Sequence, residues 1–168
     1  NVRLGDPETQ AILPRLKSDL LDLFEGIATG TLSERHLDVD DRTAVTIVLA
    51  SEGYPGECAK GKSIIGADLV RDAYVFHAGT RNKNDTLVTD GGRVLSVTGI
   101  GKDLESAIAS AYRAADTIGF EGRYRRDDIG KDLVKEPSQR ATAPGKHEGQ
   151  GPVPLRPWCR APSPCGCT

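Results

Sequence analysis

Five polar side chains with complementary chemistry fall within the first ten residues of the chain. Asn1 and Gln10 carry amides, Arg3 a guanidinium group, and Asp6 and Glu8 carboxylates. Carboxylate and amide oxygens are the ligands that hard divalent cations prefer, and a guanidinium group pairs with phosphate or carboxylate oxygens in a fixed geometry. The segment therefore predicts a site that handles a metal ion, a phosphate group and an amine.

A strand followed by a helix is predicted to position these groups. Residues 2–4 favour extended structure, which the turn at residues 5–7 ends because Pro7 disfavours a helical conformation at Asp6. We expect Asp6 to cap one long helix, whose dipole would place partial positive charge beside Asp6 and Glu8. Apolar side chains at three- and four-residue spacing define its buried face. They are Leu13, Leu16, Leu20, Leu23, Phe24 and Ile27.

Short apolar segments separated by glycine-containing turns predict strands in the middle of the chain. They are expected at residues 44–50, 74–80, 86–89, 93–99 and 120–124. The sequence Asp90-Gly91-Gly92 is typical of a hairpin turn because these residues tolerate positive φ. A second helix is predicted between Asp103, a good N-cap, and Gly119. These elements predict an α+β fold, a mixed or antiparallel sheet with two main helices.

The composition limits the classes of partner. A chain of 168 residues with a net charge of -2 is long enough for one domain with a core, and it has no large positive field that would attract nucleic acid or an anionic membrane. No apolar run approaches the ~20 residues of a membrane span. The chain contains no methionine, and we expect residue 1 to be an internal position of a longer, cytoplasmic protein.

The composition changes at Lys135, after which most of the ten prolines occur. Residues 135–168 lack apolar periodicity and are predicted to be disordered. An out-of-frame or vector-derived extension would have the same composition, so both interpretations stay open. Three cysteines and a histidine in this tail match no common zinc-finger spacing, and zinc binding is not expected. They are His147, Cys159, Cys165 and Cys167.

The first ten residues resemble the signature of the phosphoribosylamine–glycine ligases (glycinamide ribonucleotide synthetases), ATP-grasp enzymes of purine biosynthesis. Further motifs resemble the same family in its order and with similar spacing, and the resemblance extends over about residues 1–134. They are Gly53-Tyr54-Pro55-Gly56, Val75-Phe76-His77-Ala78-Gly79-Thr80, Thr89-Asp90-Gly91-Gly92-Arg93-Val94-Leu95 and Tyr124-Arg125-Arg126-Asp127-Asp128-Ile129-Gly130. Each motif alone is weak, and the combination is highly specific.

This resemblance implies a C-terminal portion of such a ligase. Residues 1–30 would be the end of the ATP-grasp domain, and residues 31–134 a small domain that closes over the substrates. The N-terminal domain and nearly all of the nucleotide-binding domain would be missing partners. The family reaction uses ATP to convert glycine to an acyl phosphate, which the amine of 5-phosphoribosylamine then attacks. Glycine, 5-phosphoribosylamine and ATP are thus the implied small-molecule ligands.

The resemblance also implies roles for individual residues. Asn1 matches the second ligand of a Glu-x-Asn pair that binds Mg²⁺ or Mn²⁺ with the ATP phosphates. Arg3 matches the position that steers the acyl intermediate, and Asp6 the acidic residue near the ribose or amine of the acceptor. Arg81 and Arg93 match basic positions expected to hold the 5-phosphate. Because phosphoryl transfer depends on groups of the nucleotide-binding domain, we expect the isolated chain to be inactive.

Two alternatives remain for the chain as it stands. It is either a catalytically inactive fragment or a module that binds a phosphorylated ligand without catalysis. Individual residues also carry plainer interpretations. His77 is expected to be a core or supporting histidine rather than a base, Cys58 to be inert, and Glu8 to be a partner of the helix dipole as readily as a substrate contact.

Overall fold

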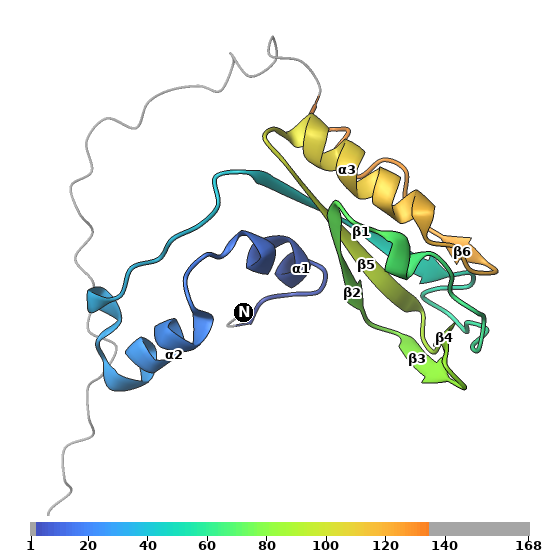
Figure 1. Ribbon diagram of the computed structural model, residues 1–168, viewed down its shortest axis with the longest axis horizontal. Helices are drawn as coiled ribbons and strands as arrows, with labels where there is room; N and C mark the ends of the chain where they lie inside the picture. The colour runs from blue at the N-terminus through green and yellow to red at the C-terminus, as the bar shows by residue number, and fades with distance from the viewer. Residues whose placement is uncertain (1–2, 135–168) are drawn as a thin grey trace, which may run out of the picture. The chain divides into compact units, whose positions relative to one another are not determined.

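The computed structural model describes residues 3–134, which form two antiparallel sheets and three α-helices (Figure 1). The larger sheet has the strand order β2-β5-β1-β6, and all of its neighbouring strands are antiparallel. Its strands are β1 (Thr43–Ser51), β2 (Ala73–His77), β5 (Arg93–Gly101) and β6 (Arg123–Tyr124). The smaller sheet pairs β3 (Thr80–Lys83) with β4 (Thr86–Thr89).

The core lies between one face of the larger sheet and α3 (Leu104–Thr117). Ile47 faces Val97 across the β1–β5 ladder, and both are fully buried. The helix packs closely because its inner face is alanine-rich and because β5 has a glycine, Gly99, where a Cβ would overlap the backbone of Ala111. The predicted strand at 44–50 and the predicted helix after Asp103 are therefore confirmed.

Helix α1 (Glu8–Ile12) lies on the opposite face of the same sheet from α3 (Figure 1). Two threonine hydroxyl groups, one of them fully buried, hold it there. The Oγ1 of Thr98 donates to the backbone oxygen of Gln10 at 2.9 Å, and the Oγ1 atoms of Thr46 and Thr98 lie 2.8 Å apart. Thr98 is fully buried, so α1 is attached to the centre of the sheet by hydrogen bonds as well as by packing.

The prediction of one long N-terminal helix is wrong. After α1 a 3₁₀ turn follows (Leu13–Arg15), then Leu16 becomes extended and bridges Val39, and α2 spans Leu20–Thr29. Pro14 cannot donate a helical hydrogen bond, and the Asp19 carboxylate accepts from Leu21 N and so begins a new helix.

The other predictions for this N-terminal region also need correction. Asp6 does not cap α1, because Pro7 occupies the N-cap and provides no side-chain cap. Arg3 and Leu4 lie outside any strand. On α2, the predicted apolar face is only partly covered in the described residues: Leu20 and Leu23 are half-buried, whereas Phe24 is 55 % and Ile27 60 % exposed.

The predicted hairpin through Asp90-Gly91-Gly92 is also wrong. β4 pairs with β3 through a turn at Asn84 and Asp85, which both have positive φ, whereas β5 pairs with β1 and β2. The predicted strand at 74–80 accordingly divides, with β2 ending at His77 and β3 starting at Thr80.

The predicted strand at 120–124 is reduced to the two residues of β6. Within residues 3–134, no helix is both long enough and apolar enough to cross a membrane. The predicted disorder or foreign origin of residues 135–168 concerns positions outside the described residues.

Candidate functional site

Asp6 and Arg93 meet at the start of β5, although 87 positions separate them in the sequence. The Nη2 of Arg93 lies 3.1 Å from Oδ2 of Asp6, and its Nη1 donates to the Asp6 backbone oxygen at 3.4 Å. Gln10 Nε2 donates to Oδ1 of the same carboxylate at 3.1 Å. Because both charged side chains are partly exposed, the ion pair stabilises the fold by only about 0–1 kcal/mol. The same exposure leaves both charged groups accessible to a ligand.

A groove of about 280 Å³ adjoins this ion pair. Its volume is just below the ~300–1,000 Å³ of typical small-molecule sites. β1 forms its floor, with the α1 turn, the loop after β1 and the segment after β6 around it. The lining residues are Pro7, Thr46, Ile47, Val48, Ala50, Tyr54, Arg93, Tyr124, Arg125, Arg126 and Ile129. The combination of apolar and aromatic walls with guanidinium groups suits a small ligand that has an apolar ring face and an anionic group.

The register of the sheet explains why these side chains converge. Ala50 of β1 pairs with Arg93 on one side and with Tyr124 on the other. Tyr54 lies on the backbone of Gly92, where any Cβ would overlap its ring. Gly92 is therefore required for the wall of the groove and not for a hairpin turn.

Arg81 does not reach this groove. On β3, its Nε and Nη2 donate to Oδ2 of Asp90 at 3.0 and 2.6 Å, and Lys60 lies 3.6 Å from the same carboxylate. Hydrogen bonds from Arg81 hold the pKa of Asp90 below its usual value. The strand that carries Arg81 nevertheless begins beside Arg93, because the backbone of Gly79, just before β3, bonds the backbones of both Arg93 and Asp90. The structure thus brings Asp6 and Arg93 together and leaves the Arg81 guanidinium apart.

The remaining predicted residues have separate surroundings. Arg3 is exposed, and its Nη1 donates to the neighbouring Leu4 oxygen at 3.3 Å. Asn1, the predicted metal ligand, lies outside the described residues. His77 is exposed beside Thr80, so the prediction of a core histidine is wrong, although a supporting role remains open. Cys58 is a free, partly buried thiol.

The described residues do not fit a complete metal site. Among residues 3–134, no three His, Cys, Asp or Glu side chains gather closely enough to hold a metal ion. Because Mg²⁺ is bound through oxygen ligands, often one or two carboxylates with substrate phosphates, an exposed Asp6 already bonded to Arg93 and Gln10 is not such a site by itself.

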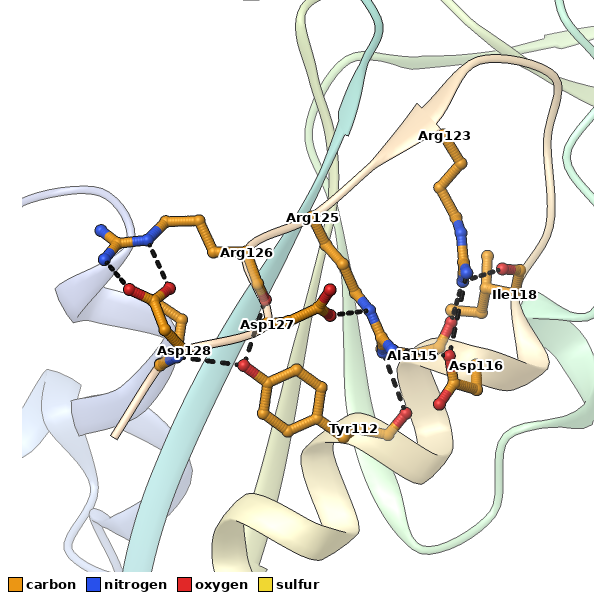
Figure 2. A network of polar contacts seen from close by, with 10 residues as sticks. Tyr112, Ala115, Asp116, Ile118, Arg123, Arg125, Arg126, Asp127 and Asp128 are labelled. Atoms are coloured by element: carbon orange, nitrogen blue, oxygen red, sulfur yellow. Dashed lines mark hydrogen bonds and ion pairs between the residues drawn. The ribbon is translucent and has the colours of Figure 1, made fainter. Parts of the chain in front are cut away.

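A polar network holds the segment after β6 against α3 (Figure 2). Arg123 Nη1 donates to the backbone oxygens of Ala115 and Ile118 at 2.6 and 2.7 Å, and thereby satisfies carbonyl groups at the end of the helix. The Arg125 guanidinium lies 4.9 Å from the ring centroid of Tyr112 and pairs with Asp116 at 2.9 Å. The motif at 124–130 was noticed in the sequence only as a resemblance, and its contacts with α3 were not predicted.

Comparison with known sequences shows that the chain belongs to the family of phosphoribosylglycinamide synthetase C domains. A family model described as phosphoribosylglycinamide synthetase, C domain, matches residues 44–132, which is more than half of the chain. The phosphoribosylamine–glycine ligase of Chlorobaculum tepidum is 50 % identical over 77 % of this chain and 31 % of its own length. That of Caldanaerobacter subterraneus subsp. tengcongensis is 47 % identical with the same coverage.

A solved structure agrees with this family. The crystal structure of the phosphoribosylamine–glycine ligase from Thermotoga maritima matches with a TM-score of 0.62 and 36 % identity, over 77 % of this chain and 32 % of that one. The resemblance seen in the sequence motifs and the α+β class are therefore confirmed. The chain spans about a third of the length of these relatives.

Proposed function

We propose that this chain is the C-terminal part of an ATP-dependent carbon–nitrogen ligase that joins glycine to 5-phosphoribosylamine in purine biosynthesis, and that it forms the acceptor side of the active site. The names of the relatives support the reaction class. The observation that carries the proposal is the meeting of Asp6 and Arg93 at the mouth of an apolar groove. A phosphorylated sugar carries both an anionic group and a ring to occupy such a groove.

In the proposed site, Arg93 binds the 5-phosphate of the acceptor. Its contacts with Asp6 use two of the five N–H donors of a guanidinium group, so three remain for phosphate oxygens. Asp6 accepts from the ribose or the amine of the same ligand, and Arg81 provides an outer phosphate contact. Arg3 stabilises the charge that develops when the amine nitrogen attacks the acyl carbon and phosphate leaves.

We further propose that ATP and Mg²⁺ or Mn²⁺ bind to the rest of the intact ligase. The nucleotide would supply the phosphoryl group that activates glycine, and Asn1 would be one metal ligand. The described residues do not fit a metal site, so the roles proposed for Arg93, Asp6, Arg81 and Arg3 do not involve the ion.

A binding titration tests the acceptor site. Ribose 5-phosphate added to the ¹⁵N-labelled 168-residue chain is expected to shift the NMR signals of residues around the groove. Arg93→Ala is expected to weaken binding by roughly tenfold or more, the effect of losing a charge-assisted hydrogen bond, and Arg81→Ala by less. Arg113→Ala, an exposed change on α3 across the sheet, is the control. Unchanged affinity in the Arg93 and Arg81 variants would count against the proposal.

The second candidate is binding without catalysis by the isolated chain. The chain spans only about a third of the relatives it matches, and phosphoryl transfer relies on positioning groups that surround the nucleotide. We therefore expect no glycinamide ribonucleotide from the purified chain supplied with ATP, Mg²⁺, glycine and 5-phosphoribosylamine. Turnover by the pure chain would contradict this expectation.

A further inference from the structure

Two further arginines, Arg125 and Arg126, line the groove, and Arg126 has the more exposed side chain of the two. The Nε and Nη2 of Arg126 donate to Oδ1 and Oδ2 of Asp128 at 2.8 and 2.6 Å. This bidentate pair uses two of the five N–H donors and fixes the plane of the group, so three donors remain for a ligand. Arg126 is 64 % exposed, as Asp128 is, and solvent molecules reach the free donors.

The positions of Arg93 and Arg126 suit one shared anion. Arg93 and Tyr124 lie on opposite sides of Ala50 in neighbouring strands, which places their Cα atoms about 10 Å apart. Arg126 follows two residues after Tyr124 and lines the same cavity as Arg93. Each cation has its own carboxylate, Asp6 or Asp128, and this lowers the repulsion between the two guanidinium groups before a ligand arrives.

The backbone that carries Arg126 depends on Tyr112 of α3. β6 ends at Tyr124, so the ladder of the sheet does not hold the residues that follow. Instead the Tyr112 hydroxyl donates to the Arg126 backbone oxygen and accepts from Ile129 N, both at 3.1 Å (Figure 2). One hydroxyl therefore fixes both ends of the segment 126–129.

Arg125 strengthens the same attachment. Its guanidinium group lies over the Tyr112 ring and donates to the backbone oxygen of Tyr112 at 3.4 Å. It also pairs with the carboxylates of Asp116 and Asp127. Only 17 % of the Arg125 side chain is exposed. Arg125 thus lines the groove but is engaged with α3 and Asp127, whereas its neighbour Arg126 is more exposed and keeps donors for a ligand.

We propose that Arg126 is a second phosphate-binding residue of this groove, acting with Arg93 on a phosphorylated sugar, and that Tyr112 is its positioning residue. The inference rests on the proposed function. It gives a role to Arg126, which the sequence analysis noted only as part of a motif, and to Tyr112, which no motif contains. Tyr54 and Tyr124 provide the apolar walls against the sugar ring, and the two guanidinium groups provide the phosphate contacts.

The test is a ribose 5-phosphate titration of the 168-residue chain, followed by NMR of backbone amides and arginine Nε–H groups. Arg126→Ala is expected to weaken binding roughly tenfold. Tyr112→Phe keeps the ring under Arg125 and removes only the hydroxyl, and is expected to weaken binding several-fold. Tyr74→Phe on β2 removes the same atom away from the groove and is the matched control, with unchanged affinity.

A positioning role has a signature that general destabilisation lacks. In Tyr112→Phe, the Ile129 amide is expected to exchange faster, and the Arg126 Nε–H signal to lose its ligand-induced shift while that of Arg93 still moves. If Tyr112→Phe loses its dispersed spectrum, Arg126→Ala decides the question. Normal binding by both variants, with weak binding by Arg93→Ala, would overturn this inference alone. No saturable binding by the unchanged chain would overturn the proposed function and the inference with it.

Discussion

Replacing Thr98 with valine tests whether the attachment of α1 holds Asp6 at the groove. Thr98 has one hydroxyl hydrogen, and it is used in the bond to the Gln10 oxygen. Thr46 must therefore donate to Thr98 in the contact between their Oγ1 atoms. Valine has nearly the same shape as threonine, so the substitution removes the hydrogen bonds and leaves the packing volume almost unchanged.

The expected cost follows from the full burial of Thr98 and the partial burial of its two partners, Thr46 and Gln10. Thr98 is fully buried, and leaving a buried donor or acceptor without a partner costs about 1–3 kcal/mol per group. Thr98→Val leaves both the Thr46 hydroxyl and the Gln10 oxygen unpaired. Relaxation of α1 toward solvent relieves part of this cost, so we expect a loss of about 2–3 kcal/mol. Thr46→Val removes only the donor to Thr98, and it is expected to cost about 1 kcal/mol.

Urea unfolding monitored by circular dichroism measures both variants, since small single domains usually unfold in a two-state manner. Hydrogen exchange then locates the effect. Amides of α1 and the Asp6–Arg93 contact should lose protection in Thr98→Val, and ribose 5-phosphate binding should weaken although no groove residue has changed. Equal costs for the two variants, or an unchanged α1 in Thr98→Val, would refute the conclusion that Thr98 attaches α1 to the sheet.

Two further substitutions test the packing and the capping of α3. Gly99→Ala is expected to destabilise the fold by about 1–3 kcal/mol in urea unfolding, because its Cβ would overlap the backbone of Ala111. Gly119→Ala is the matched control, since its Cβ would meet only the side chain of Ile65, at 3.5 Å. Equal losses of stability in the two variants would contradict this explanation. Hydrogen bonds from Ser106 lower the pKa of Asp103, so its contribution is present above the unfolded pKa of ~3.9 and is lost as pH falls through the lower folded value. Asp103→Asn should therefore show a smaller loss of stability on acidification than the unchanged chain, and identical acid profiles would argue against the cap.

Local sequence signals predicted the elements that local interactions specify. The β-branched segment at 44–50 and the alanine-rich helix after Asp103 both agree with the structure, because a continuous apolar run and a helix cap are properties of neighbouring residues. The N-terminal helix failed although its signals were present. Pro14 and Asp19 mark the two ends of the interruption, and the bridge from Leu16 to Val39 that stabilises it depends on distant residues.

In the candidate site too, local sequence signals selected single residues, whereas their contacts depend on distant parts of the chain. Motif resemblance selected Asp6 and Arg93 separately, but no spacing in the sequence indicates that a residue before α1 pairs with the start of β5. Gly92 was assigned to a turn because glycine tolerates positive φ, whereas the structure uses it to admit the ring of Tyr54. Arg126 was noticed only as part of a charged motif, since its place in the groove follows from the pairing of β6 with β1.

The groove depends on contacts from both faces of the sheet. On one face, the Thr98–Gln10 bond holds α1, and with it Asp6 beside Arg93. On the other face, Tyr112 of α3 holds the backbone of Arg126. Asp6 thus contacts the guanidinium group of Arg93, and Tyr112 fixes the backbone that carries Arg126, so both helices contribute to the arrangement of the groove. Thr98 and Tyr112 are not proposed to contact the ligand, so a substitution at either residue should change affinity only through the positions of other groups. If the phosphate bridges Arg93 and Arg126, the effects of the two substitutions on affinity should be non-additive.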